Sequence, residues 1–177
     1  GFSVGDFSAN VLGSGMFIAQ EFAWNDQRIR NKFSFHKRKY GQPDLNARAD
    51  YLYGKTEIER FIKDYNAQTY WLSANIHSFF PQSKFPRWLS LSVGYGADGM
   101  FGARSNVAVD KNGTVTFDRS DIKRYRQWYI SPDLDFSKIQ TNKKGLKVLF
   151  FLLDAVKFPA PTLEYSNGGF KGHWIVF

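Results

Sequence analysis

The stretch WLSLSVGYG, residues 88–96, decides the fold of this chain. Large apolar residues alternate in it with serine and glycine, and this two-residue period predicts a β-strand because successive side chains of a strand point to opposite faces. One face then carries Leu89, Leu91, Val93 and Tyr95. Large apolar side chains opposite small polar ones are typical of a lipid-facing strand, and a strand packed against helices has a similar pattern.

Three further segments are predicted to be extended. Asn112-Gly113 lies between two short alternating runs and predicts a hairpin over residues 106–118, because this dipeptide readily supplies the positive φ angles of the turn. Residues 126–137 and 170–177 also alternate. Pro132 within the first of them indicates a sheet edge or a β-bulge, since proline cannot donate a hydrogen bond to a ladder.

Two helices are predicted from apolar periodicity. Thr56 and Glu59 have the spacing of a capping box at the start of a helix over about residues 57–66. The other helix covers residues 4–24, where small residues lie between apolar ones. That pattern fits an intramembrane or interfacial helix as well as an ordinary buried one.

These elements predict an α+β fold in one domain over residues 1–177, with two or three helices, a β-hairpin and further short antiparallel strands beside a membrane or a partner. The patterns of the segments 69–80 and 146–158 do not separate helix from strand. A small outer-membrane β-barrel is the alternative, but prolines interrupt its candidate strands.

The composition combines an aromatic excess with a positive charge. Phe, Tyr and Trp make up 18% of the residues, which is more than a soluble core of this size needs and suits contact with lipid or a large partner. The net charge of +8 favours polyanions such as anionic lipid headgroups, lipopolysaccharide or nucleic acid. Cysteine is absent, so we expect no disulfide or zinc–thiolate site, and no other metal or cofactor is expected. The first residues lack the basic and apolar regions of a signal peptide, which predicts a mature protein or a fragment.

The candidate binding residues form two groups. Residues 25–54 are predicted to be a long basic connection with aromatic residues interspersed, in which residues 32–36 could form one short strand. Its basic side chains are interpreted as contacts for anionic headgroups. They are Arg28, Arg30, Lys37, Arg38 and Lys39. The second group is interpreted as facing lipid or a partner, and it consists of Trp88, Leu89, Leu91, Val93, Tyr95 and Trp174. Two other interpretations of residues 25–54 are nucleic-acid binding through basic and aromatic residues and a solvated basic loop without a binding role, and the pattern favours the solvated loop.

A polar pair on the first predicted helix is a candidate site. Asp6 and Asn10 are four residues apart and therefore lie on one helix face. Polar residues in an apolar helix are often functional. Hydrogen bonds between helices, or an N-terminal cap, are the alternative.

No combination of residues in the sequence indicates catalysis, so the chain is predicted not to be an enzyme. His36, His77 and His173 lie far apart and lack the i, i+4 spacing of a helical metal site. Asp133 and Asp135 share one strand face and could act in acid–base chemistry, but this spacing is more typical of a solvated face.

The glycines that follow the strand at residues 88–96 formally match a dinucleotide-binding fingerprint. Gly94-x-Gly96-x-x-Gly99 is not followed by a helix-forming run, so the helix N-terminus that binds pyrophosphate is missing. We interpret these glycines as serving a turn or close packing.

Four stretches of the chain carry a resemblance to a known family. They are GDFSANVLGSGMFIAQEFAWNDQRIRNKFSFH (residues 5–36), KDYNAQTYWLSANI (63–76), KFPRWLSLSVGYGADGM (84–100) and LKVLFFLLDAVKFPAPTLEY (146–165). Together they resemble the YfiM-like predicted periplasmic lipoproteins of Bacteroidota. Residues 6–13 also look like the closing helix of VanZ-like membrane proteins, in which an Asp, an Asn and a Gly recur at this spacing.

The resemblance implies an envelope protein at the outer membrane or its periplasmic face. It also implies that the chain is the C-terminal portion of a longer protein, because members of the family have a signal sequence, further helices and an Asp-Lys-x-x-His element before the matching region. The family offers no activity to carry over, and its implied location argues against nucleic-acid binding.

We therefore predict a non-catalytic, membrane-associated envelope protein that is an accessory or structural subunit of an outer-membrane complex. Its expected partners are that protein complex and lipid or lipopolysaccharide. The alternative is a VanZ-like protein that binds or acts on an anionic lipid or glycan.

Overall fold

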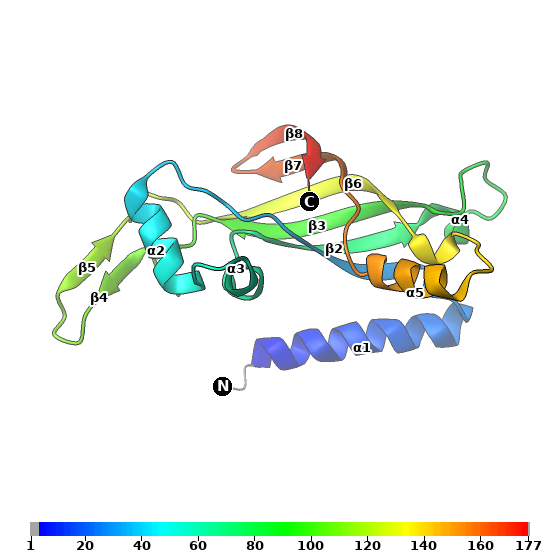
Figure 1. Cartoon of the computed structure of the whole chain (residues 1–177), viewed down its shortest axis with the longest axis horizontal. Helices are drawn as coiled ribbons and strands as arrows, with labels where there is room; N and C mark the ends of the chain where they lie inside the picture. The colour runs from blue at the N-terminus through cyan, green and yellow to red at the C-terminus, as the bar shows by residue number, and fades with distance from the viewer. Residues whose placement is uncertain (1–3, 177) are drawn as a thin grey trace.

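The computed structural model describes residues 4–176, apart from the side chains at positions 5, 6 and 9. The fold is α+β, with one six-stranded antiparallel sheet, one two-stranded sheet and helices placed around them (Figure 1). The predicted fold class is therefore confirmed.

The large sheet has the strand order β1-β2-β3-β6-β7-β8, so its neighbouring strands follow one another along the chain. Its strands are β1 (Ile29–Phe35), β2 (Gln68–Asn75), β3 (Leu89–Asp98), β6 (Tyr125–Leu134), β7 (Ala160–Ser166) and β8 (Gly169–Val176). The small sheet is the predicted hairpin, and it pairs β4 (Val107–Val109) with β5 (Val115–Asp118).

The helices connect the strands. They are α1 (Val4–Trp24), α2 (Pro43–Tyr53), α3 (Glu57–Lys63), α4 (Ile76–Phe79), the 3₁₀ helix η1 (Phe136–Lys138) and α5 (Lys144–Leu153). The capping box of Thr56 and Glu59 is confirmed at the start of α3. This helix ends earlier than predicted because Asp64 caps it and pairs with Arg60 at 2.7 Å. Within the described residues, no helix has both the length and the apolarity needed to cross a membrane.

Two segments left open by the sequence are now assigned. Residues 69–80 form most of β2 followed by α4, and residues 146–158 form most of α5 followed by an extended stretch. The interpretation of residues 25–54 as a long connection with at most one short strand is wrong in one respect. The strand expected at residues 32–36 is present as β1, but the segment also contains helix α2. Strand β7 was not predicted either, because prolines obscure its alternation.

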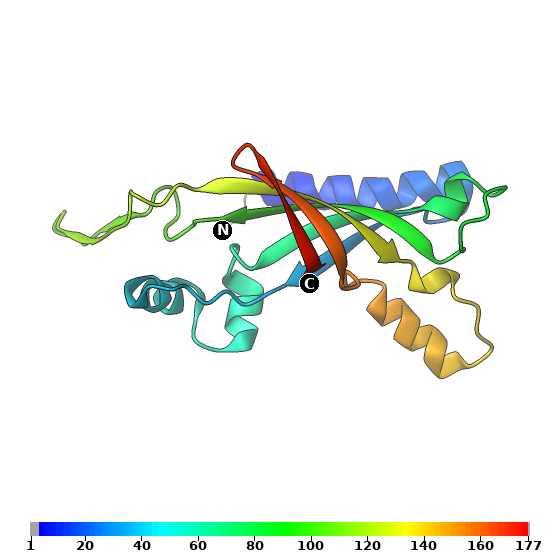
Figure 2. The ribbon, with the colours of Figure 1, turned by 90° about the horizontal axis from the view of Figure 1, so that it is seen from above.

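The large sheet is long and strongly coiled. In Figure 1, α1 runs along one side of it, α2, α3 and the β4–β5 hairpin lie toward one end, and α4 and α5 lie toward the other. Figure 2 shows β7 and β8 crossing the other strands at a steep angle, as expected from the cumulative twist of neighbouring strands.

The coiling brings residues 155–157, in the extended stretch before β7, beside β1. Phe33 N donates to Ala155 O at 3.0 Å, and Lys157 N donates to Phe33 O at 2.9 Å. This is an isolated parallel bridge, and the sheet does not close into a barrel within the described residues. The alternative of a small closed barrel is therefore wrong for this structure.

Side-chain burial in the sheet is inverted relative to a water-soluble protein. We call the buried face of the sheet the inward face, and it consists mainly of polar residues. They include Lys32, Ser34, Ser73, Ser90, Ser92, Gln127, Ser131, Asp133, Thr162, Glu164 and Ser166. The opposite face, which we call the outward face, consists mainly of large apolar residues that remain accessible. They include Tyr70, Leu72, Leu91, Val93, Tyr95, Trp128, Ile130, Leu163 and Tyr165.

A conventional apolar core is present but small. It lies under α2, where Leu45, Ala49, Tyr53 and Phe101 are buried together. The sheet itself is filled by polar groups and two aromatic rings, those of Trp71 and Tyr129, whose centroids are 5.6 Å apart.

Candidate functional site

The inward face of the sheet contains a buried charge cluster centred on Asp133. The coiled sheet brings together Lys32 from β1, Asp133 from β6 and Lys157 from the stretch before β7. Lys32 Nζ lies 3.4 Å from Asp133 Oδ2 and 3.2 Å from Asp154 Oδ1. Lys157 Nζ lies 3.7 Å from Asp133 Oδ1. Lys32, Asp133 and Lys157 have side chains with no exposed surface, so the cluster is shielded from solvent.

Hydrogen bonds complete the surroundings of Asp133. The Ser92 hydroxyl donates to its Oδ2 at 2.8 Å, and the backbone N–H groups of Leu134 and Phe158 donate to its Oδ1 at 2.8 and 3.2 Å. Lys157 in turn donates to the Phe158 carbonyl at 2.6 Å. A buried charge is tolerated only when it is paired and hydrogen-bonded, and this arrangement meets both requirements.

The ionisation of the cluster follows from these contacts. Burial alone would raise the pKa of Asp133, but the charges of Lys32 and Lys157 and the Ser92 hydroxyl outweigh it and hold the pKa below its usual value. Burial lowers the pKa of Lys157, although the charge of Asp133 opposes that change. The carboxylate is thus kept ionised by two cations from distant parts of the chain.

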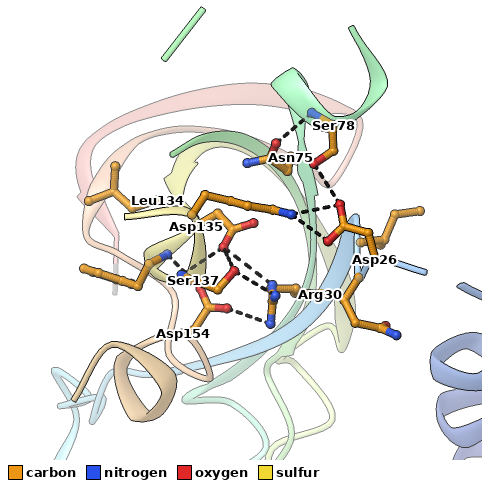
Figure 3. A network of polar contacts seen from close by, with 12 residues as sticks. Asp26, Arg30, Asn75, Ser78, Leu134, Asp135, Ser137 and Asp154 are labelled. Carbon is orange, nitrogen blue, oxygen red and sulfur yellow. Dashed lines mark hydrogen bonds and ion pairs between the residues drawn. The ribbon is translucent and has the colours of Figure 1, made fainter. Parts of the chain in front are cut away.

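A second layer of polar contacts closes the end of the sheet near α4 and α5. Figure 3 shows Arg30 pointing toward Asp135, Ser137 and Asp154. Arg30 Nη1 lies 2.9 Å from Asp154 Oδ2, and its Nη2 donates to Ser137 Oγ at 2.8 Å. In the same view Asp26 accepts a hydrogen bond from Ser78 at 3.4 Å. The Arg30 contacts join β1 to η1 and to the end of α5, and the Asp26 contact joins the segment before β1 to α4.

The expectation that Asp133 and Asp135 lie on a solvated face is wrong. Each residue is only 2% exposed. Asp133 is enclosed by the coiled sheet, and Asp135 accepts hydrogen bonds from Ser137 N and Oγ at 3.1 and 2.5 Å. Their contacts hold strands and helices together, which indicates a structural role for both carboxylates.

A third polar group lies on the inward face of β6, β7 and β8. Glu164 accepts a hydrogen bond from Gln127 at 2.9 Å, and His173 Nε2 lies 2.7 Å from its other carboxylate oxygen. Burial opposes ionisation of Glu164, but these hydrogen bonds hold its pKa below the usual value. In the part of the chain that the structure describes, no three His, Cys, Asp or Glu side chains come together in a way that could hold a metal ion.

Gly94 of β3 serves close packing, which is one of the two roles predicted for these glycines. A Cβ atom at Gly94 would lie 2.6 Å from the ring of Trp71, which is buried and donates to Ser34 Oγ at 2.9 Å. Gly94 therefore provides the space that the Trp71 ring occupies on the inward face. No nucleotide-binding geometry follows from these residues.

The outward face is the most extensive candidate site. The predicted alternation of β3 is confirmed, and Leu91 and Val93 on this face are each 47% exposed. The same pattern continues on both sides, with Leu72 on β2 and Ile130 on β6 about half exposed. Contiguous apolar surface of this extent is typical of contact with a membrane or a protein, because a monomer in water rarely exposes it.

Helices α1 and α5 extend this apolar surface. Phe7, Val11, Leu12 and Phe22 of α1 are more than half exposed, so α1 is not an ordinary buried helix. Its main attachment is Gln20, whose side chain exchanges two hydrogen bonds with the Ile29 backbone at 2.7 and 3.0 Å.

A mainly apolar cavity of about 600 Å³ separates the two helices from β1. Its lining includes Phe17, Ile18, Ile29, Phe151 and Leu152. The cavity opens onto the apolar surface of α1 and α5, so we treat it as part of that surface.

In the structure, most of the predicted basic residues contact other residues of the same chain. Arg30 belongs to the network of Asp154, Lys37 pairs with Glu57 at 2.6 Å, and Arg38 pairs with Asp98 at 2.6 Å. The Arg28 guanidinium lies over the ring of Trp24, 4.8 Å from its centroid. Lys39 is exposed.

The other predicted residues are distributed over several elements. Trp88 precedes β3 and is 41% exposed, and Trp174 on β8 is 89% exposed. Asn10 is exposed on α1, whereas the side chain of Asp6 lies outside the described residues. The polar pair of Asp6 and Asn10 therefore stays a prediction.

Sequence reasoning missed the outward residues of the neighbouring strands. Those in line with β3 are Tyr70, Leu72, Trp128, Ile130, Leu163 and Tyr165. The signal was present as alternation in residues 69–80 and 126–137, but combining these segments into one surface requires the strand order.

The chain was also compared with known proteins. No protein-family model, curated protein or solved structure matches it.

Proposed function

We propose that this chain is a non-catalytic, membrane-associated protein of the cell envelope whose outward face lies in the apolar phase of a lipid membrane. The observation that carries the proposal is the inverted burial of the sheet. Charged and hydroxyl side chains lie inside, and Leu, Val, Ile, Tyr and Trp side chains remain accessible outside.

Physical chemistry favours an apolar medium around this arrangement. Each apolar side chain that stays in water forgoes about 25 cal/mol per Å² of burial, and the outward face and helices α1 and α5 leave many such side chains uncovered. A membrane covers a surface that extends over a sheet and two helices without needing a complementary shape. The net charge of +8 further favours an anionic membrane surface.

The resemblance to YfiM-like predicted periplasmic lipoproteins supports an envelope location, at the outer membrane or its periplasmic face. Within this proposal the chain acts as an accessory or structural subunit of an outer-membrane protein complex. Its buried carboxylates are neutralised by internal partners, which suits a structural role better than a catalytic one. The alternative, a VanZ-like protein that binds or acts on an anionic lipid or glycan, stays a prediction, because the Asp6 side chain of its candidate site lies outside the described residues.

Replacement of Leu91 by Asp tests the proposal. Leu91→Asp places a charge at the centre of the outward face, where it would cost about 2 kcal/mol in hydrocarbon, or roughly a 30-fold loss of partitioning. Binding to phosphatidylethanolamine–phosphatidylglycerol vesicles is measured by flotation, with circular dichroism to verify folding. We expect folded protein with strongly reduced binding.

Val115→Asp is the matched control, because it introduces the same charge at an exposed aliphatic residue of the β4–β5 hairpin. It should bind vesicles like the unmodified chain. A folded Leu91→Asp variant that also binds like the unmodified chain would show that the outward face does not contact lipid.

A further inference from the structure

One aromatic residue from each strand of the large sheet lies in a single row across the outward face. Each member is the register partner of the next. In sheet order, the aromatic row consists of Phe33, Tyr70, Tyr95, Trp128, Tyr165 and Phe170. Three of the five neighbouring pairs are in ring contact, with centroid separations of 5.5 Å for Phe33–Tyr70, 5.0 Å for Tyr95–Trp128 and 5.0 Å for Tyr165–Phe170. The strand register therefore aligns six aromatic residues across six strands, and they form three contacting pairs.

The two sides of the aromatic row differ in chemistry. Two residues further along each central strand, toward the end of the sheet near α4, lies an aliphatic row. It consists of Leu72, Val93, Ile130 and Leu163, which are also register partners. On the other side, the next outward positions include Phe35, Gln68, Ala97 and Arg126, of which Arg126 is exposed and Gln68 is buried. The Tyr70 hydroxyl donates to Gln68 Oε1 at 2.9 Å, so its polar end points away from the aliphatic row.

We infer that the aromatic row lies at the headgroup level of a phospholipid bilayer, with the aliphatic row in the hydrocarbon and Arg126 on the water side. This inference rests on the proposed function and adds the orientation and depth of the sheet. Trp and Tyr collect at the membrane–water interface because each ring has an apolar body and a polar group. Four such rings in register, flanked by Phe33 and Phe170, lie between an aliphatic row and the charged Arg126, which is the order of layers that a bilayer presents.

The spacing along β3 agrees with this placement. Leu91 lies four residues beyond Tyr95, or about 13 Å along an extended strand. Half of the hydrocarbon core of a bilayer is about 15 Å thick. With Tyr95 at the headgroups, Val93 lies within the hydrocarbon and Leu91 approaches its middle.

The orientation makes a prediction that other arrangements do not share. Positions in one row should lie at equal depth, whereas positions along one strand should differ. If the strands instead lay parallel to the membrane plane, positions along one strand would share a depth. If the outward face bound a protein, none of these positions would contact lipid chains.

Single-cysteine variants of the full chain allow a direct test, because the sequence contains no cysteine. Tyr95→Cys, Trp128→Cys and Tyr165→Cys sample the aromatic row, and Val93→Cys and Leu91→Cys sample β3. Each variant carries a spin label and is bound to phosphatidylethanolamine–phosphatidylglycerol vesicles. The ratio of label accessibility to dissolved oxygen and to a water-soluble nickel complex reports depth.

We expect similar ratios at the three positions of the aromatic row and a several-fold rise from Tyr95 through Val93 to Leu91. Asn112→Cys, in the turn of the β4–β5 hairpin, is the aqueous control and should remain accessible to nickel. A flat profile along β3, with all labels in contact with lipid, would overturn the inference and leave the proposed function intact. Labels that do not respond to vesicles at all would overturn both.

Discussion

Asp133 holds the inward face of the sheet together, because its carboxylate compensates Lys32 and Lys157 at once. Neither cation is near it in sequence. Removing the carboxylate would leave Lys157 without its ion-pair partner and Lys32 with Asp154 alone, in a space without exposed surface, so the cost of desolvating the two ammonium groups would be only partly compensated.

The first prediction concerns the charge of this residue. Asp133→Asn keeps the shape of the side chain and removes its charge, so we expect the free energy of unfolding to fall by about 3–5 kcal/mol. Urea denaturation followed by tryptophan fluorescence measures the change. Glu57→Gln is the control, because Glu57 pairs with Lys37 at the surface and its side chain is 69% exposed. A loss of less than about 1 kcal/mol is expected there.

The same variant should also change the response to acid. The folded-state pKa of Asp133 lies below its unfolded value of 3.8, so its stabilising contribution is complete above pH 3.8 and is lost as the pH falls through the folded-state pKa. The stability difference between the unmodified chain and Asp133→Asn should therefore shrink in that acid range. A difference that stays constant would contradict the assigned ion pairs. If Asp133→Asn does not fold, Ser92→Ala removes only the 2.8 Å hydrogen bond to Asp133 and should cost about 1.5–3 kcal/mol.

At the scale of one strand, two glycines on the inward face of β3 differ in how tightly their neighbours pack against them. Gly94 faces the Trp71 ring, and an added methyl group would meet ring atoms at 2.6–2.9 Å. The ring cannot move freely, because it packs on Tyr129 and donates a hydrogen bond to Ser34. Gly96, two residues further on the same face, has ordinary contacts at 3.4–3.5 Å.

We therefore expect Gly94→Ala to lower the free energy of unfolding by about 1–3 kcal/mol, the usual cost of overpacking a filled interior. Gly96→Ala is the matched control on the same strand and face, and it should be tolerated. Thermal unfolding of both variants measures the difference. Equal losses of stability at the two positions would contradict the tight packing of the Trp71 ring against Gly94.

The elements differ in how well the sequence predicted them. Strand β3, the β4–β5 hairpin and the start of α3 were predictable because alternation, an Asn-Gly turn and a capping box are local signals. Helix α2 was missed although Pro43 lies in its first turn and Gly54, with a φ of 95°, follows its end.

Strand β7 was missed for a different reason. Two prolines precede or interrupt its alternation, and the turn at Asn167-Gly168 that joins it to β8 was overlooked, although both residues have positive φ angles. The charge cluster could not be predicted, because Lys32, Asp133 and Lys157 meet only when the sheet coils. The sequence was sufficient to predict that Leu89, Leu91, Val93 and Tyr95 lie on one face of β3. The alignment of these residues with apolar residues of the neighbouring strands could not be predicted, because it depends on the strand register.

For the molecule as a whole, the strand order leaves the two edges of the large sheet in different situations. β1 is partly covered by the bridge to the stretch before β7. Among the described residues β8 pairs only with β7, and six of its eight residues are exposed. An uncovered edge presents backbone N–H and C=O groups that lack partners in the chain.

The uncovered edge of β8 has a consequence for amide hydrogen exchange. Opening β8 breaks a single ladder, whereas opening β3 breaks ladders to β2 and β6 along most of its length. Deuterium should therefore enter the amides of β8 first and those of β3 last, because exchange follows the free energy of local opening. Mass spectrometry of the chain in solution measures this order. Protection of β8 equal to that of β3 would mean that the edge is covered in solution. The expected order of exchange would show that β8 opens before the central strands.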